Sequence, residues 1–263
     1  MYQTEDHTFA ICAYKESPYL RECVSSLVNQ TEKSQIIVCT STPNAYIDEV
    51  CQEFELPLHI SSKKSGIARD WNFAMARAKT PLVTIAHQDD VYKPTYLESA
   101  LFHLNGAENP LLFFSGYSEL RDGAECASNT LLNVKRLMLK PLENKKRSSS
   151  VRARRTILAF GDPIGCPSIT YVTPKLSLPL FMEDYFGSLD WQMLEEVSKL
   201  QGDFVYDPSV QMSHRIHGGS ETSSLIESNL RSEEDYDMFC KFWPDLIARL
   251  LSKVYSLSQK SNC

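Results

Sequence analysis

The hydrophobic pattern of the first hundred residues alternates between short apolar runs and longer segments in which apolar positions recur every three or four residues. The short runs cover 8–13, 36–39, 58–60 and 82–86, and most of their positions are apolar. Such runs are typical of strands that helices cover on both faces. The segments between them have helical periodicity, and this alternation of strand and helix predicts a parallel, Rossmann-like sheet.

Local signals indicate where some of the helices begin. Ser17 and Pro18 predict an N-cap and a first-turn proline, and Gly66 predicts the opening of a later helix. The second half is less regular, and its predicted elements are a helix over 94–105, a strand over 111–114, a helix opened by Ser188, a strand over 204–208 and helical segments around 239–257. We expect one catalytic domain over 1–222, with halves 1–105 and 106–222, followed by a C-terminal helical extension over 223–263.

The composition narrows the class of protein. The chain has 263 residues, 43% of them hydrophobic, and a net charge of −6, which argues against a dedicated nucleic-acid-binding protein. No apolar run is long enough to cross a bilayer, and Glu5 and Asp6 interrupt any signal-peptide pattern. Eight cysteines without CxxC spacing are typical of reduced thiols. The sequence therefore predicts a cytoplasmic protein.

The candidate chemistry lies at the end of the strand over 82–86. This strand runs directly into His87, Gln88, Asp89 and Asp90. Two adjacent carboxylates repel each other unless a ligand or a partner neutralises them. In parallel sheets ligands bind at the carboxyl ends of the strands, where this pair falls. The residues alone predict either a hard divalent cation carrying a diphosphate or a hydrolytic zinc site.

Three segments resemble family 2 glycosyltransferases with the GT-A fold: "TFAICAYKESPYLRECVSSLVNQT", "GIARDWNFAMARAKTPLVTIAHQDDVY" and, later, "SLDWQMLEEV". The resemblance implies an α/β fold, a GT-A (Rossmann-like) mostly parallel sheet flanked by helices, with a C-terminal helical extension. It implies an inverting glycosyltransferase that uses a nucleotide-sugar donor, with UDP-sugars favoured. The implied acceptor is a glycan or a lipid-linked sugar in surface or cell-envelope polysaccharide synthesis.

The same resemblance implies roles for the carboxylates. Asp90 would bind Mn²⁺ or Mg²⁺ directly, and Asp89 would contact the donor's ribose or sugar. Asp190, at the start of a predicted helix, is the implied catalytic base, because inverting transfer needs a carboxylate to accept the acceptor's proton. Glu183 and Asp184 are the reserve candidates. We also expect from the placement of Asp90 at a strand end that Asp90→Ala leaves the fold intact.

The remaining donor contacts also follow from the resemblance. His217 is implied as a further metal ligand and Arg215 as a phosphate contact. The positions that match nucleoside-contacting residues of the family are Ala13, Tyr14, Glu16, Thr40 and Asn72. Many members carry an aspartate after the second strand, where this chain has Thr40 and Ser41. UDP is therefore favoured only because it is the commonest donor nucleotide of the family.

Two other functions stay open at this point. "AHQDD" with the later "HRIH" resembles zinc deacetylases of N-acetylglucosamine conjugates, in which His87, Asp90 and His217 would bind zinc and Asp89 would act as base. A non-catalytic relative that binds a sugar nucleotide is the other possibility. The basic stretch 140–155 is either a solvated, mobile loop or a contact with an anionic acceptor at the inner membrane face.

Overall fold

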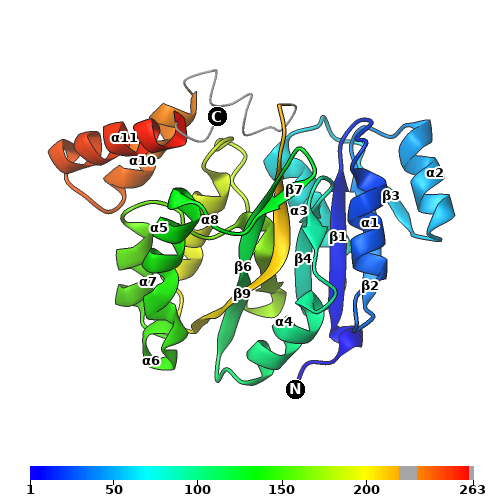
Figure 1. Ribbon diagram of the computed structural model, residues 1–263, viewed down its shortest axis with the longest axis horizontal. Helices are drawn as coiled ribbons and strands as arrows, with labels where there is room; N and C mark the ends of the chain where they lie inside the picture. Colours follow the sequence, from blue (N-terminus) through cyan, green and yellow to red (C-terminus); the bar gives the residue numbers. More distant parts are fainter. Residues whose placement is uncertain (219–229, 261–263) are drawn as a thin grey trace.

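The computed structural model describes residues 1–218 and 230–260, and its N-terminal half is a parallel sheet. The strand order is β3-β2-β1-β4, with every neighbouring pair parallel. The elements are β1 (His7–Ala13), α1 (Leu20–Val28), β2 (Gln35–Thr40), α2 (Ala45–Glu53), β3 (Leu58–Ile60), α3 (Ile67–Arg77) and β4 (Leu82–His87). The predicted alternation of strand and helix is confirmed (Figure 1).

The second half extends this sheet as a mixed one. Beyond β4 the order is β8-β6-β9-β5, and β8 is antiparallel to both β4 and β6. The long strands β6 and β9 run parallel, β5 pairs with β9, and β7 pairs with β6. The elements are β5 (Val91–Tyr92), α4 (Tyr96–Asn105), β6 (Pro110–Arg121), β7 (Ala124–Cys126), α5 (Thr130–Leu139), β8 (Ile169–Val172), α8 (Leu189–Ser198) and β9 (Asp203–Ile216).

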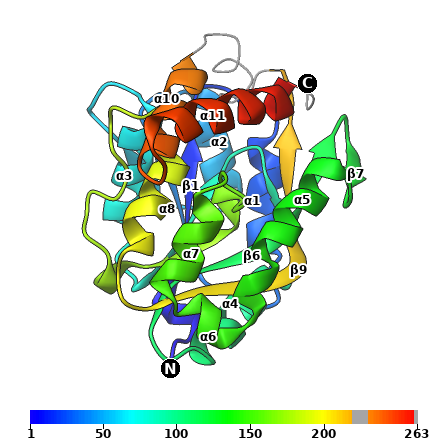
Figure 2. The same ribbon diagram turned by 90° about the vertical axis from the view of Figure 1, so that its left-hand side faces the viewer.

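Two hydrophobic clusters cover the two faces of the sheet and explain the continuous apolar runs. Successive residues of β1 go to different clusters: Phe9 packs with α1 and α4, and Ala10 packs with α3 and α8. Both side chains are fully buried. Because side chains alternate between the faces of a strand, a strand covered on both faces must be apolar at every position. Figure 2, turned by 90°, shows the helices on either side of the strands.

The helix starts agree with two of the three sequence signals. Gly66 and Ser188 are the N-cap residues of α3 and α8. The predicted N-cap of the first helix was wrong, because α1 begins at Leu20 rather than after Ser17. The Ser17 carbonyl first closes a turn with the Leu20 N–H at 3.2 Å, and Pro18 lies inside that turn.

The C-terminal helices form a hairpin against α8. α10 (Leu230–Cys240) and α11 (Asp245–Lys260) pack on each other, and the rings of Phe239 and Tyr255 lie 5.0 and 5.6 Å from that of Trp191 on α8. Among the described residues, no helix has the length and apolar character needed to cross a membrane.

The basic stretch 140–155 is mostly helical, so the prediction of a loop is wrong, although most of its basic side chains are exposed. It contains the short helices η2 (Lys140–Glu143) and α6 (Lys145–Ser148) and most of α7 (Val151–Leu158). The guanidinium of Arg154, 1% exposed, donates to the carbonyls of Ser198, Leu200 and Gly202. The last turn of a helix leaves carbonyls without intrahelical donors. Arg154 therefore caps the end of α8 from inside the protein.

Arg154→Met should destabilise the fold, whereas Arg152→Met, an exposed neighbour on the same helix, should not. Each buried carbonyl left unpaired costs about 1–3 kcal/mol, so we expect a loss of about 3 kcal/mol or more in the free energy of unfolding. The control should stay within about 0.5 kcal/mol of wild type. Urea denaturation measures both values, and equal losses in the two variants would contradict the capping role.

Candidate active site

A cleft of about 480 Å³ opens at the carboxyl ends of the parallel strands. Its walls come from elements distant in the sequence: the end of β1, the start of α3, the turn after β4, strand β6, helix α5 and the start of α8. This is the edge at which sheets of this kind bind ligands. The structure thus brings Asp89 and Asp190 to the same cavity.

Asp90 is fully buried behind the cleft wall. Its Oδ1 accepts hydrogen bonds from His214 Nδ1 at 2.9 Å and from the Arg215 N–H at 2.8 Å. Its Oδ2 lies 3.6 Å from His87 Nδ1 and has no hydrogen-bond partner among the described residues. Burial alone would raise the pKa of Asp90, but His214, His87 and the Arg215 N–H outweigh it and hold that pKa below its ordinary value. Asp90 is therefore an anion that joins β4 to β9.

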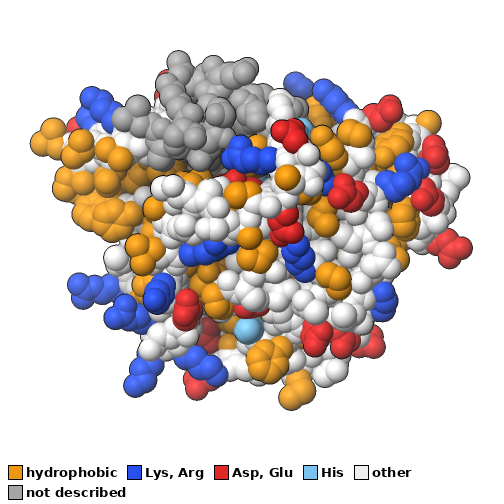
Figure 3. Space-filling view, viewed as in Figure 1, with side chains coloured by type: hydrophobic (Ala, Val, Ile, Leu, Met, Phe, Trp, Pro, Cys, Tyr) orange, Lys and Arg blue, Asp and Glu red, His pale blue; other side chains and the backbone are white. Residues whose placement is uncertain are grey.

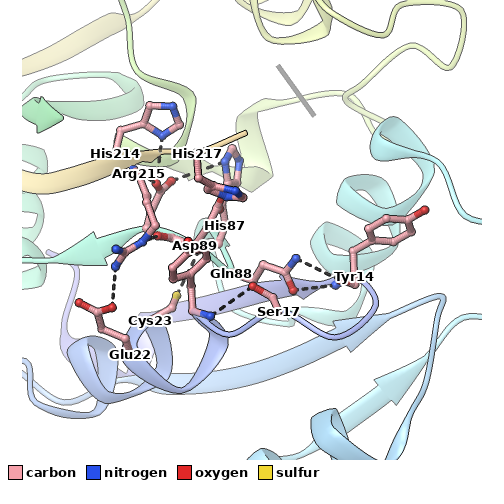
Figure 4. A network of polar contacts seen from close by, with 12 residues as sticks. Tyr14, Ser17, Glu22, Cys23, His87, Gln88, Asp89, His214, Arg215 and His217 are labelled. Atoms are coloured by element: carbon pink, nitrogen blue, oxygen red, sulfur yellow. Dashed lines mark hydrogen bonds and ion pairs between the residues drawn. The ribbon is translucent and has the colours of Figure 1, made fainter. Parts of the chain in front are cut away.

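Asp89 faces the cleft beside the end of β9. Its Oδ2 lies 3.1 Å from His217 Nε2, and its side chain is 21% exposed (Figure 4). The Asp89 carbonyl accepts from Arg215 Nε at 2.8 Å. The guanidinium of Arg215 also pairs with Glu22 at 2.6 Å and lies over the ring of Tyr19. Arg215 is thus engaged within the protein, while Asp89 and His217 are presented to the cleft.

The other end of the cleft is held by two side-chain contacts. Gln88 uses its amide to accept from the Tyr14 N–H at 2.9 Å and to donate to the Tyr14 carbonyl at 3.1 Å, which fixes the chain after β1 (Figure 4). Asp70 on α3 accepts from Ser41 Oγ at 3.0 Å and from the Gly66 N–H at 3.3 Å. Burial raises the pKa of Asp70 in spite of these hydrogen bonds. Helix α3 therefore supplies a carboxylate beside the end of β2, where the chain itself has Thr40 and Ser41.

Asp190 lines the cleft from the first turn of α8. The chain before it is fixed by Glu234 of α10, whose carboxylate accepts from the N–H groups of Phe186, Gly187 and Ser188, each at 2.8 Å. Asp190 itself accepts from the Trp191 N–H at 2.8 Å. The C-terminal hairpin thus sets the position of Asp190.

The residues around Asp89 fit a hard divalent cation better than a closed zinc site. Among the residues that the structure describes, no three His, Cys, Asp or Glu side chains are grouped closely enough to hold a metal ion. Asp89 and His217 form one close pair at the cleft, while the Oδ2 of Asp90 is buried 3.6 Å from His87 Nδ1. Mg²⁺ and Mn²⁺ typically use one or two carboxylates and complete their shell with substrate phosphates and water.

The sequence matches the model of glycosyl transferase family 2 over residues 8–156, more than half of the chain. The chain belongs to glycosyl transferase family 2. It is therefore a glycosyltransferase, as the sequence motifs predicted. The match begins in β1, includes the Asp89-Asp90 turn and ends in α7.

Comparisons with individual proteins agree with this family. An uncharacterized glycosyltransferase of Haemophilus influenzae is 24% identical over 227 residues, which cover 82% of this chain and 66% of that protein. Residues 1–349 of S. aureus TarS in complex with UDP-GlcNAc superpose with a TM-score of 0.64 at 13% identity, covering 96% of this chain and 72% of that TarS segment. A mannosyltransferase of Pyrobaculum calidifontis, in complex with GDP-Man and Mn²⁺, gives a TM-score of 0.64 at 15% identity and covers 100% and 74% of the two chains. The GT-A fold is confirmed.

The family membership removes the deacetylase interpretation, and the geometry gives the reason. His87 lies beside Asp90 while His217 lies beside Asp89, so the residues required for that zinc site form two separate pairs. The His87 ring instead stacks on Trp71 at 4.8 Å. Three strands also precede the motif, whereas the deacetylases carry it after their first strand.

Not all of the expected glycosyltransferase site residues line the cleft. Those that do are Ala13, Tyr14, Asp89, Asp190 and His217. Glu16, Thr40, Asn72, Asp90 and Arg215 do not line it, and neither do the reserve candidates Glu183 and Asp184. Asn72 holds the chain before α8, donating to the Phe181 carbonyl and accepting from the Leu180 and Phe181 N–H groups. Asn72 therefore ties α3 to the chain that precedes α8.

Sequence reasoning missed Asp70, Gln88 and Lys135, which all line the cleft. Asp70 had a signal, because it lies four residues after the helix-opening Gly66 and so faces back toward the helix start. Gln88 had none beyond its place in the strand-end motif. Lys135 had no signal either, because the order of apolar and polar residues along α5 does not indicate that one of its basic side chains faces the cleft.

Asp90→Asn should lower stability strongly and Asp89→Asn only slightly, which replaces the expectation that Asp90 is dispensable for the fold. Removing one partner of a buried ion pair costs about 3–5 kcal/mol, because the other charge is left uncompensated. The partly exposed Asp89–His217 pair contributes about 1 kcal/mol or less. Urea denaturation of metal-free protein tests this difference. Equal stability of the two variants would show that Asp90 does not join the strands.

Proposed function

We propose that this glycosyltransferase moves a sugar, with inversion, from a nucleoside diphosphate to an acceptor hydroxyl. The observation that carries the proposal is the placement of the Asp89–His217 pair and Asp190 on one cleft of a family 2 enzyme. The Asp89–His217 pair can bind a metal-diphosphate, and the Asp190 carboxylate can accept a proton. We infer a UDP-sugar as donor, because a related structure holds UDP-GlcNAc, although another holds GDP-Man.

The nucleoside end of the cleft would lie between β1 and α3. Ala13 and Tyr14 follow β1, and the Asp70 carboxylate stands beside Ser41 at the end of β2. Many family members carry an aspartate on the chain after the second strand to bind the base or the ribose. Asp70 supplies the same chemistry from the neighbouring helix, and a carboxylate accepts well from a ribose hydroxyl or a base N–H.

The metal would be Mn²⁺ or Mg²⁺, as in the mannosyltransferase complex that contains Mn²⁺. Asp89 and His217 are the side chains that would hold it, with substrate phosphates and water completing its shell. When bound, such an ion neutralises the charge that builds up on the departing diphosphate. The protein's own part is to position the Asp89 carboxylate against His217 and to hold the Asp90 anion against His214.

The transfer step itself falls to Asp190. The acceptor hydroxyl oxygen forms a bond to the anomeric carbon while the bond from that carbon to the diphosphate oxygen breaks. The hydroxyl proton moves to the Asp190 carboxylate, and the nucleoside diphosphate leaves with the electron pair. Because the oxygen attacks from the face opposite to the leaving group, the anomeric configuration inverts.

Asp190→Asn should lower turnover by about a hundredfold to ten-thousandfold, the usual loss when a general base is removed. Donor binding should be nearly unchanged, because proton transfer belongs to the transition state. Calorimetry with UDP and Mn²⁺ measures binding, and NMR of the product from wild-type enzyme reads the anomeric configuration. Asp184→Asn, an exposed acid outside the cleft, is the matched control. Near-native turnover of Asp190→Asn, or a retained configuration, would refute the assignment.

We also propose that the acceptor is a glycan or a lipid-linked sugar in surface polysaccharide synthesis, and that the enzyme meets it at the cytoplasmic face of a membrane. Lys145, Lys146 and Arg147 are exposed on α6. Figure 3 shows hydrophobic side chains over α10 and α11 above the Lys and Arg side chains of α6 and α7. On α11, Leu246 and Leu250 are 82% and 64% exposed. Exposed apolar and basic side chains on one side of a protein are typical of binding at an anionic bilayer surface.

The triple variant Lys145→Gln, Lys146→Gln, Arg147→Gln should bind anionic liposomes more weakly than wild type. Each basic residue near such a surface contributes about 1 kcal/mol, so we expect a loss of roughly a hundredfold at low salt. The control is Lys63→Gln, Lys64→Gln, Lys79→Gln, which removes the same charge from exposed positions outside this segment. Co-sedimentation measures both. If wild-type protein ignores anionic liposomes at low salt, the membrane contact is wrong.

A further inference from the structure

Lys135 is the cation of an otherwise acidic cleft. The carboxylates of Asp70, Asp89 and Asp190 line the cavity, and Lys135 is the one Lys or Arg among the described residues that line it. Its Nζ donates to the Tyr117 hydroxyl at 2.8 Å and forms no ion pair with a carboxylate of the described part of the chain. Two of its three N–H groups thus have no protein acceptor in that part of the chain.

The ammonium of Lys135 is held in place by a rigid wall. The Tyr117 ring packs against Gly165, where a Cβ would lie only 2.9 Å from the ring, and its edge meets the His214 ring. The next residue of α5, Arg136, donates to the carbonyls of Tyr117 at 3.2 Å and Ala127 at 2.6 Å. These contacts tie α5 to β6, so the position of Nζ is set before any ligand arrives.

Lys135 remains charged in this position. Burial alone would lower the pKa of Lys135, but Tyr117, Tyr255 and Asp162 raise it above its ordinary value. A desolvated ammonium is costly unless an acceptor or a counter-charge faces it. An anionic ligand would supply charge-assisted hydrogen bonds to the two remaining N–H groups.

The strand order shows which part of a substrate would meet Lys135. By the proposed function, the nucleoside end lies at β1 and β2. Asp89 follows β4, the strand next to β1, and the His217 ring lies 4.9 Å from the ring of Tyr19, which follows β1, so the Asp89–His217 pair stands on the β1 side of the cleft. Tyr117 lies on β6. In the order β1-β4-β8-β6, Tyr117 is three strand spacings from β1, or roughly 14 Å. Gly165, Cys166 and Pro167 line the same wall. Lys135 therefore lies on the side of the metal-binding pair that faces away from the nucleoside.

We infer that Lys135, positioned by Tyr117, binds a phosphate or carboxylate group on the acceptor side of the cleft. The inference rests on the proposed function, since that function identifies the nucleoside end. The anionic group belongs either to the acceptor or to the sugar that is transferred. In both cases the enzyme selects a substrate that carries a negative charge beside the reacting carbon.

Inorganic phosphate, titrated into metal-free and nucleotide-free enzyme, is the first probe. Lys135→Gln should weaken phosphate binding by about tenfold or more, Lys135→Arg should retain it, and Tyr117→Phe should weaken it by a smaller factor. Lys140→Gln removes an exposed lysine five residues away and should bind phosphate like wild type. A thermal melt of each variant verifies folding. No binding to wild type, or equal binding to Lys135→Gln and wild type, would overturn the inference.

The second probe is UDP with Mn²⁺, and it separates this site from the donor site. Lys135→Gln should bind UDP as wild type does, and UDP should not displace phosphate. Displacement, or loss of UDP affinity in Lys135→Gln, would place Lys135 on the donor diphosphate and refute the acceptor-side position. If the wild-type enzyme binds phosphate through Lys135 but does not bind UDP, the proposed function is wrong, whereas the anion site at Lys135 is supported.

The source of the anion follows from hydrolysis of donors without acceptor. If Lys135→Gln slows hydrolysis of a uronic-acid donor but not of a neutral-sugar donor, the charge belongs to the transferred sugar. If hydrolysis of both donors is unchanged and only transfer falls, the charge belongs to the acceptor. Unchanged hydrolysis together with unchanged transfer would overturn the inference.

Discussion

The buried carboxylate of Asp90 joins the two halves of the sheet at the point where the chemistry occurs. It follows β4, and the groups that hold it, His214 Nδ1 and the Arg215 N–H, lie more than 120 residues later on β9. Burying this charge without partners would cost several kcal/mol, so the turn after β4 and the end of β9 are stable only together. Asp89, His217 and Arg215 take their positions from that contact.

A second constraint reaches the cleft from the C-terminal hairpin. One carboxylate, Glu234 on α10, accepts the three N–H groups that precede α8, and Ser188 Oγ donates to Asp235. Arg154 closes the other end of α8. Because both ends of α8 are held by residues from other elements, Asp190 is presented by a fixed helix. The hairpin predicted as an extension thus contributes directly to the geometry of the candidate base.

The parallel half of the fold and the carboxylate pair could be predicted, because their signals are local. Continuous apolar runs reflect burial on both faces, and glycine or serine at a helix start reflects capping. The pairing of β6 with β9 joins residues about ninety positions apart and has no such signal. In the sequence, nothing distinguishes Arg154 from an exposed basic residue. It is buried because the fold brings it to the carbonyl groups at the end of α8. Likewise, Asp70 restores from a helix the carboxylate that the chain after β2 lacks.

The separate partners of the acidic residues explain how one cleft can carry several carboxylates. Asp90 is paired with His214, Asp89 with His217, Asp70 with Ser41 and the Gly66 N–H, and Asp190 with the Trp191 N–H. Each carboxylate therefore has its own local hydrogen-bond partner. The cleft has three regions: hydrogen-bond donors stand beside Asp70, imidazoles beside Asp89 and Asp90, and the Lys135 ammonium on the wall formed by α5 and β6. Under the proposed function and the inferred anion site, a substrate that spans these three regions is polar at the first, a diphosphate at the second and anionic at the third.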